Sequence, residues 1–118
     1  MNADAELIMV ARQAEAAERT ILACNSGKQR PSETETEFMG DCARDLSDRL
    51  VAMKAVTIAG MVAKARAVRV SMQNSIAWEV GSTVESCGES HELLMWSLLN
   101  DLVAFAESAS DTKVVRHG

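Results

Sequence analysis

Cys87 and His91 are the pair of residues whose types and spacing most readily suggest chemistry. Four residues apart on a helix, they would bring a thiolate and an imidazole to one side, as a zinc site or a Cys/His nucleophile pair needs. Two ligands do not make a zinc site, however, and Gly88 is expected to break the helix between them. The other candidate ligands fall on predicted core stripes or near the C-terminus: Cys24, Cys42 and His117. We therefore predict no metal, no cofactor and no catalytic residue.

An acidic series could also suggest a metal site or an acid/base pair. Its members are Glu33, Glu35, Glu37, Asp41, Asp45 and Asp48. The first three lie where a helix is expected to begin, and there they compensate the helix dipole. The other three alternate with Arg44 and Arg49, as exposed i, i+4 pairs do. Helix geometry therefore accounts for these carboxylates without a bound ion.

Residues 58–74 are distinguished by their charge. They include three basic residues and no acid: Lys64, Arg66 and Arg69. As a recognition helix of a DNA-binding regulator, the segment would contact phosphates through Lys64 and Arg66 and bases through Gln73 or Asn74. Three charges are few, and the net charge of −5 makes the whole chain repel a phosphate backbone. We interpret the segment as a basic face that pairs with acidic neighbouring helices, and keep the regulator as the alternative.

Arg69 differs from the other two cations because it falls within the apolar arc of its helix. A guanidinium in that position needs a partner, since burying an unpaired charge costs free energy. The expected counterpart is one of three carboxylates: Asp45, Asp48 or Asp101. We interpret Arg69 as a residue that specifies register or oligomeric state, with a ligand anchor as the alternative. Both interpretations predict that Arg69→Leu is poorly tolerated.

The spacing of apolar residues predicts the first two of about four helices. One coiled-coil seam, with intervals of 3, 4, 3, 4 and 3, consists of Leu7, Val10, Ala14, Ala17, Ile21 and Cys24. It predicts a helix over 5–23, capped by Asn2 or Asp4, followed by a linker over 25–33. A second helix follows a capping pair at Thr34 and Glu37. Its stripe consists of Phe38, Cys42, Leu46, Leu50 and Met53, and the two helices are expected to form a long antiparallel hairpin.

Thr57 is the expected cap of a third helix, which ends before Gly81. Its apolar stripe consists of Ile58, Met61, Ala65, Val68, Met72 and Ile76. Residues 81–90 form a second break, with overlapping capping pairs at Ser82/Glu85 and Ser86/Glu89. The last helix carries Leu94, Leu98, Leu102 and Phe105 on one stripe, flanked by Met95, Leu99 and Val103. Because this apolar arc is wide, we expect the last helix to be the most buried.

The composition favours a single all-α domain over 1–109 with a frayed tail over 110–118. Of 118 residues, 47% are hydrophobic but only 3% aromatic, with one proline, which does not suit a β-sandwich or barrel. We find no run of about 18 apolar residues and no secretory signal pattern, so a membrane protein is not expected. Three cysteines without framework spacing suit reduced thiols, and we therefore expect a cytoplasmic protein.

Small side chains on long helices predict an oligomer, because a rod buries less surface than a sphere does. We expect a homodimer or higher homo-oligomer, with a further unidentified protein partner as an open alternative. The interface candidates are Leu7, Val10, Ala14, Ile21, Val68, Arg69, Met72 and Trp78. Trp78 is included because it falls opposite the stripe of the third helix, where a large indole suggests cover by another chain.

Two segments carry a resemblance to known proteins: LVAMKAVTIAGMVAKARAV at 50–68 and MWSLLNDL at 95–102. They resemble a group of short, mostly helical alphaproteobacterial proteins with no assigned function. In that group an Ala-Thr-Leu-Ala-Gly-x-x-Ala-Lys-Ala segment precedes a Ser-Leu-Leu-x-Asp-Leu helix. The matching segments cover about a quarter of the chain, and Ala55 stands where the group has proline. The resemblance implies a helical fold and a bacterial cytoplasmic protein, and it assigns no activity.

Overall fold

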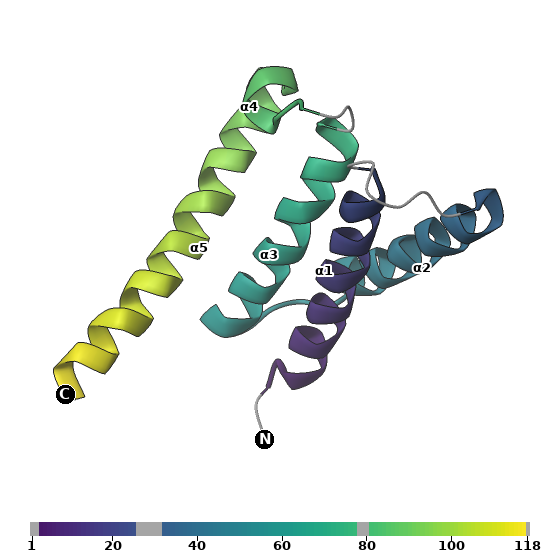
Figure 1. Cartoon of the computed structure of the whole chain (residues 1–118). Helices are drawn as coiled ribbons and strands as arrows, with labels where there is room; N and C mark the ends of the chain where they lie inside the picture. The colour runs from purple at the N-terminus through teal and green to yellow at the C-terminus, as the bar shows by residue number, and fades with distance from the viewer. Residues whose placement is uncertain (1–2, 26–31, 78–80, 118) are drawn as a thin grey trace.

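Five helices follow one another in the residues that the computed structural model describes, which are 3–25, 32–77 and 81–117 (Figure 1). They are α1 (Ala5–Asn25), α2 (Glu33–Ala52), α3 (Ile58–Ile76), α4 (Val84–Cys87) and α5 (Ser90–His117). The described residues contain no strand, so the predicted all-α fold is confirmed. Four of the helices are long, and α4 is a single turn before α5.

Helix α3 lies at the centre of the fold, between α1 and α5 (Figure 1). Helix α1 also contacts α2, which lies on the side of α1 away from α5. Helix α4 packs against the end of α3 and the start of α5. The fold is therefore a row of helices in which α5 has α3 and α4 as its neighbours, and this arrangement decides which surfaces are left uncovered.

The core between α1, α2 and α3 is built from small side chains. It consists of Leu7, Val10, Ala11, Ala14, Leu50 and Ala67. Alanine at three of these positions lets the helix backbones approach closely, and Val10 has no exposed surface at all. This is the seam that the 3, 4, 3 spacing predicted, and its first three residues are covered by helices of the same chain.

The helix starts show which capping signals the chain uses. Thr57 caps α3 as predicted, since its hydroxyl accepts a hydrogen bond from the Gly60 amide at 3.0 Å. Helix α2 starts earlier than predicted, with Ser32 in place of Thr34 as the cap and Glu35 as its partner. The Ser/Thr-x-x-Glu pattern occurs twice here, and the earlier copy lets the helix include two more residues.

The break over 81–90 is also more ordered than predicted. Thr83 and Ser86 form a reciprocal capping box that starts α4, in place of the predicted Ser82/Glu85 and Ser86/Glu89 pairs. Gly81 has φ +85°, a conformation that glycine adopts easily. Helix α3 ends at Ile76, before the predicted end near residue 80, although residues 78–80 lie outside the described part of the chain. Helix α5 continues to His117, and the frayed tail over 110–118 stays a prediction.

Candidate interaction surface

The outer face of α5 is the largest group of exposed apolar side chains on one helix. Leu94 is 74% exposed, Leu98 66% and Phe105 64%, and Met95 beside them is half exposed. At 100° per residue these first three residues lie within an arc of about 40°. Val103 is only 2% exposed and lies on the opposite side of the helix, toward α3. Helix α5 therefore has one apolar face that its own chain covers and another that it does not.

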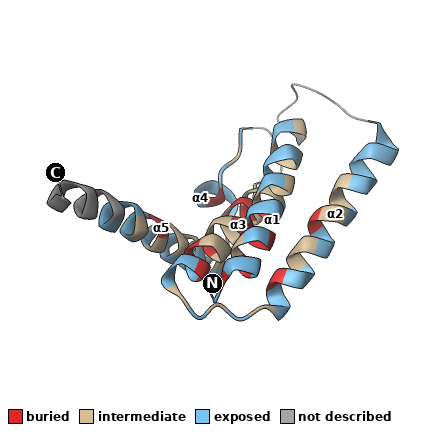
Figure 2. Ribbon diagram, turned by 90° about the horizontal axis from the view of Figure 1, so that it is seen from below, coloured by how far each residue is buried: buried red, intermediate tan, exposed pale blue. Residues whose placement is uncertain are grey.

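The expectation that the last helix is the most buried is wrong. Its apolar arc is as wide as predicted, but α5 lies at the edge of the fold, with α3 and α4 as its neighbours (Figure 2). Neighbours on one side can cover only one face of a helix. A helix that is apolar on all sides is usually buried on all sides. The apolar arc of α5 is wider than one neighbouring helix can cover. This width is the feature of the sequence that indicates an uncovered face.

Two polar contacts fix α5 on α3. Arg66 pairs with Glu107 at 3.2 Å, and the Arg69 guanidinium donates a hydrogen bond to the side-chain oxygen of Asn100, also at 3.2 Å. The predicted carboxylate partner of Arg69 is therefore replaced by a neutral amide. Asp101, one of the three predicted partners, is exposed instead. Arg69 thus joins α3 to α5 within one chain.

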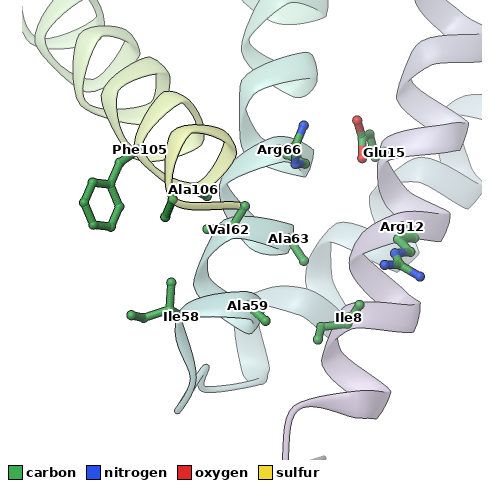
Figure 3. Close-up of a pocket in the computed structure, with 11 residues that line it drawn as sticks. Ile8, Arg12, Glu15, Ile58, Ala59, Val62, Ala63, Arg66, Phe105 and Ala106 are labelled. Atoms are coloured by element: carbon green, nitrogen blue, oxygen red, sulfur yellow. The ribbon is translucent and has the colours of Figure 1, made fainter. Parts of the chain in front are cut away.

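A groove of about 680 Å³ opens between α1, α3 and α5. Its lining includes Ile8, Ala59, Val62, Ala63 and Ala106, with Arg12, Glu15 and Arg66 on its polar side (Figure 3). Arg66 and Glu15 face each other across the groove, and Phe105 and Ile58 point outward at its mouth. Glu15 pairs with Arg19 at 2.7 Å, and Arg66 pairs with Glu107. The lining of the groove thus combines alkyl groups with charged side chains, of which Glu15 and Arg66 are ion-paired.

A smaller groove of about 240 Å³ lies between α2 and α3. Its lining includes Leu50, Val51, Val68 and Met72. Lys64 lies beside it and donates a hydrogen bond to the Met53 carbonyl oxygen at 2.7 Å, across the turn that joins the two helices. Lys64, one of the three basic residues of 58–74, therefore links α3 to the end of α2.

The three basic side chains of α3 contact other residues of the same chain. Lys64, Arg66 and Arg69 all have partners in the same chain, and Arg66 meets an acidic residue of α5 as predicted. Asn74, a proposed base-reading residue, donates to the carbonyl oxygen of Glu18 at 2.8 Å and to its carboxylate at 2.6 Å. Helix α3 also lies between α1 and α5. Binding of nucleic acid by residues 58–74 stays a prediction, and the contacts of these side chains within the chain do not add to it.

The eight predicted interface residues are placed as follows. Leu7, Val10, Ala14 and Met72 are buried by their own chain, while Ile21, Val68 and Arg69 are partly buried. Trp78 lies outside the described residues. A side chain that its own chain already buries has no surface left to offer a second subunit. Four of the eight predicted interface residues are therefore buried within the single chain, whereas Leu94, Leu98 and Phe105 of the predicted stripe of the last helix are exposed.

The residues singled out for chemistry do not form a reactive site. Cys87 ends α4 and His91 lies in α5, and Gly88 between them has extended backbone, so the two do not share a helix as a ligand pair would. Cys87 is exposed, and Cys24 and Cys42 are partly buried. Donor atoms of Glu89, His91 and Glu92 lie within 4.8 Å of one another, an exposed arrangement that is common without an ion. No further feature of Glu89, His91 and Glu92 points to a bound metal ion.

No helix of the described chain has the length and apolar character that crossing a membrane requires. Comparisons with known proteins find no family model, no curated protein and no solved structure that matches this chain.

Proposed function

We propose that this chain is a non-enzymatic helical interaction protein that associates with itself, most simply as a homodimer. The observation that carries this proposal is the outer face of α5, where Leu94, Leu98 and Phe105 are each more than three-fifths exposed. Large apolar side chains in contact with water are unfavourable, and gathered on one helix they are typical of a protein–protein contact.

The extent of the molecular surface supports the same proposal. The chain exposes 8235 Å², whereas a compact monomer of 12.7 kDa would expose about 6,200 Å². Its radius of gyration is 15.7 Å, compared with about 13.5 Å for a compact domain of this length. The excess of about 2,000 Å² is within the range that each subunit of an obligate dimer buries.

The lining of the two grooves supports a non-enzymatic role. Both are mainly apolar hollows between helices, and three of the polar residues that line them, Lys64, Arg66 and Glu15, already have partners in the chain. The cytoplasm is the compartment that we propose, since three cysteines in thiol form suit a reducing environment. A bacterial source remains a proposal that rests on the resemblance of residues 50–68 and 95–102.

Sedimentation equilibrium or light scattering over a wide range of protein concentration tests the proposal. We expect a mass of twice 12.7 kDa, or a higher multiple, that falls to 12.7 kDa only on dilution. A mass of 12.7 kDa at every concentration would contradict self-association.

A further inference from the structure

We infer that the occupant of the outer face of α5 is α5 of a second copy of this chain, packed in the antiparallel direction. This inference rests on the proposed self-association and specifies the surface and the orientation. It follows from the spacing of residues along α5, from the charges beside them and from the area that they expose.

The outer face of α5 has the spacing of a coiled-coil seam. Leu94, Leu98, Asp101 and Phe105 follow one another at intervals of 4, 3 and 4, which is the a/d pattern by which two helices pack. All four are exposed. They lie on the side of the helix away from Val103, so a second helix can pack there without displacing α3.

The exposed area is close to what a stable dimer needs. Five large apolar residues of this region are at least half exposed: Leu94, Met95, Leu98 and Phe105 of α5, and Ile58 of α3. Phe105 and Ile58 point outward together at the mouth of the groove, so α3 extends the face at one end (Figure 3). At roughly 200 Å² for each large side chain, these residues expose about 600 Å² of apolar surface. With a polar rim this approaches the roughly 800 Å² that each partner buries in a standard interface.

The lack of basic side chains in residues 90–109 favours a protein over a membrane or a nucleic acid as the partner of this face. Residues 90–109 contain Glu92, Asp101 and Glu107 and neither lysine nor arginine. Amphipathic helices that lie on anionic membranes have basic polar faces, and nucleic acid requires basic side chains. Of these carboxylates only Asp101 lies on the outer face, while Glu107 pairs with Arg66 of α3. An apolar stripe without basic side chains instead suits the apolar stripe of another protein helix.

Asp101 decides the direction of the pairing. In a parallel pair in register, each residue of the seam faces its own copy, so Asp101 would face the partner's Asp101 and the two charges would repel. In an antiparallel pair with Leu94 beside the partner's Phe105, Asp101 lies beside the partner's Leu98 instead. Residues 90–109 then overlap completely over about 30 Å. The antiparallel pair moves the two Asp101 carboxylates apart along the axis, by about 4.5 Å at 1.5 Å per residue, and places each Phe105 beside a Leu94.

Leu98→Glu is the first test of the seam, with Ala104→Glu as its matched control. Both positions are exposed on α5, but Ala104 lies about 90° from the middle of the seam. We expect Leu98→Glu to raise the dimer dissociation constant at least about ten-fold, because it places a carboxylate on the apolar seam and beside the partner's Asp101. Circular dichroism should show unchanged helix content in both variants, and Ala104→Glu should dimerise like the unmodified chain.

Disulfide cross-linking tests the direction. In a chain whose three native cysteines are changed to serine, Leu94→Cys and Phe105→Cys are prepared separately, then mixed and oxidised. The antiparallel pair predicts a cross-link between the two different variants and little within either variant alone, since a disulfide needs Cα atoms within about 7 Å. Distinct isotopic masses for the two chains identify the mixed product.

The outcomes separate this inference from the proposed function. A mixed cross-link together with a weakened Leu98→Glu dimer supports both. A dimer that Leu98→Glu leaves intact, or that cross-links only like with like, overturns the inference and leaves self-association standing. A chain that is monomeric at every concentration overturns both.

Discussion

Asp4 holds the first turn of α3 through Thr57, which lies 53 residues further along the chain. The Asp4 carboxylate accepts hydrogen bonds from the Thr57 amide at 2.7 Å and from the Thr57 hydroxyl at 2.5 Å. It also accepts one from the Val56 amide, and only 2% of the residue is exposed. The Thr57 hydroxyl lowers the pKa of Asp4 most, partly offset by burial, which raises it, and helped by the two amides. A residue just before α1 therefore anchors the start of the central helix.

We expect the stability of the protein to fall at acidic pH because of this carboxylate. The pKa of Asp4 is lower in the folded chain than its ordinary value of 3.8, so ionised Asp4 stabilises the fold above that value. The stabilisation is lost as the pH falls from 3.8 through the lower pKa of the folded state. Urea denaturation at a series of pH values would measure this slope.

Asp4→Asn is the matched variant for the pH series. The amide has nearly the shape of the carboxylate, but it carries no charge and turns two donors toward a cluster of donors. We expect a lower melting temperature at pH 7 and a smaller loss of stability on acidification. Glu85 also has a lowered pKa, through its own backbone amide and the Trp96 indole, so Glu85→Gln shows what that second carboxylate contributes. An unchanged pH slope in Asp4→Asn would contradict the role of Asp4.

Gly60→Ala should destabilise the protein for a related reason. A Cβ atom at Gly60 would overlap the Asp4 carboxylate oxygen and lie 2.7 Å from its Cγ. Because that carboxylate is held by Thr57, it cannot simply move away, and we expect a loss of about 1–3 kcal/mol in the free energy of unfolding. Chemical denaturation measures the change.

Gly40→Ala is the control for Gly60→Ala. A Cβ atom at Gly40 meets nothing within 4 Å, and the residue lies inside α2. Alanine is the better helix former there by about 0.5–1 kcal/mol, so this variant should be more stable. If both variants changed stability in the same direction, the close approach of Gly60 to Asp4 would not be the cause.

Local pattern predicted the helices well but not their neighbours. The 3, 4, 3 spacing after Leu7 and the Thr57 cap are confirmed, since both depend on residues within a few turns of each other. The contact of Asp4 with Thr57 joins distant segments, and the sequence offered Asp4 only as a cap for the first helix. An apolar stripe indicates that a face is covered, but it does not identify what covers it. For that reason the sequence did not show that α1 is covered within the chain or that the outer face of α5 is exposed.

Leu7→Ala and Leu94→Ala test this difference in cover with the same substitution. Leu7 is buried among α1, α2 and α3, so its truncation should cost about 2–4 kcal/mol of folding free energy. Leu94 is exposed in the single chain, and its truncation should change folding by less than about 0.5 kcal/mol when the chain is dilute and dissociated. The same Leu94→Ala change should weaken dimerisation. Equal folding losses at the two positions would mean that Leu94 is covered within its own chain.

Replacing Asp101, on the outer face of α5, should have the opposite effect to Leu94→Ala and strengthen dimerisation. A polar residue on a coiled-coil seam lowers stability while it specifies direction. Asp101→Leu should therefore tighten the dimer by at least about ten-fold, or about 1.4 kcal/mol, as measured by sedimentation equilibrium. Without the repulsion between carboxylates, the parallel pair should also become accessible, so Leu94→Cys chains should begin to cross-link with one another. Ala104→Leu adds an equal apolar group away from the seam and should do neither, whereas a dimer weakened by Asp101→Leu would place Asp101 outside the interface.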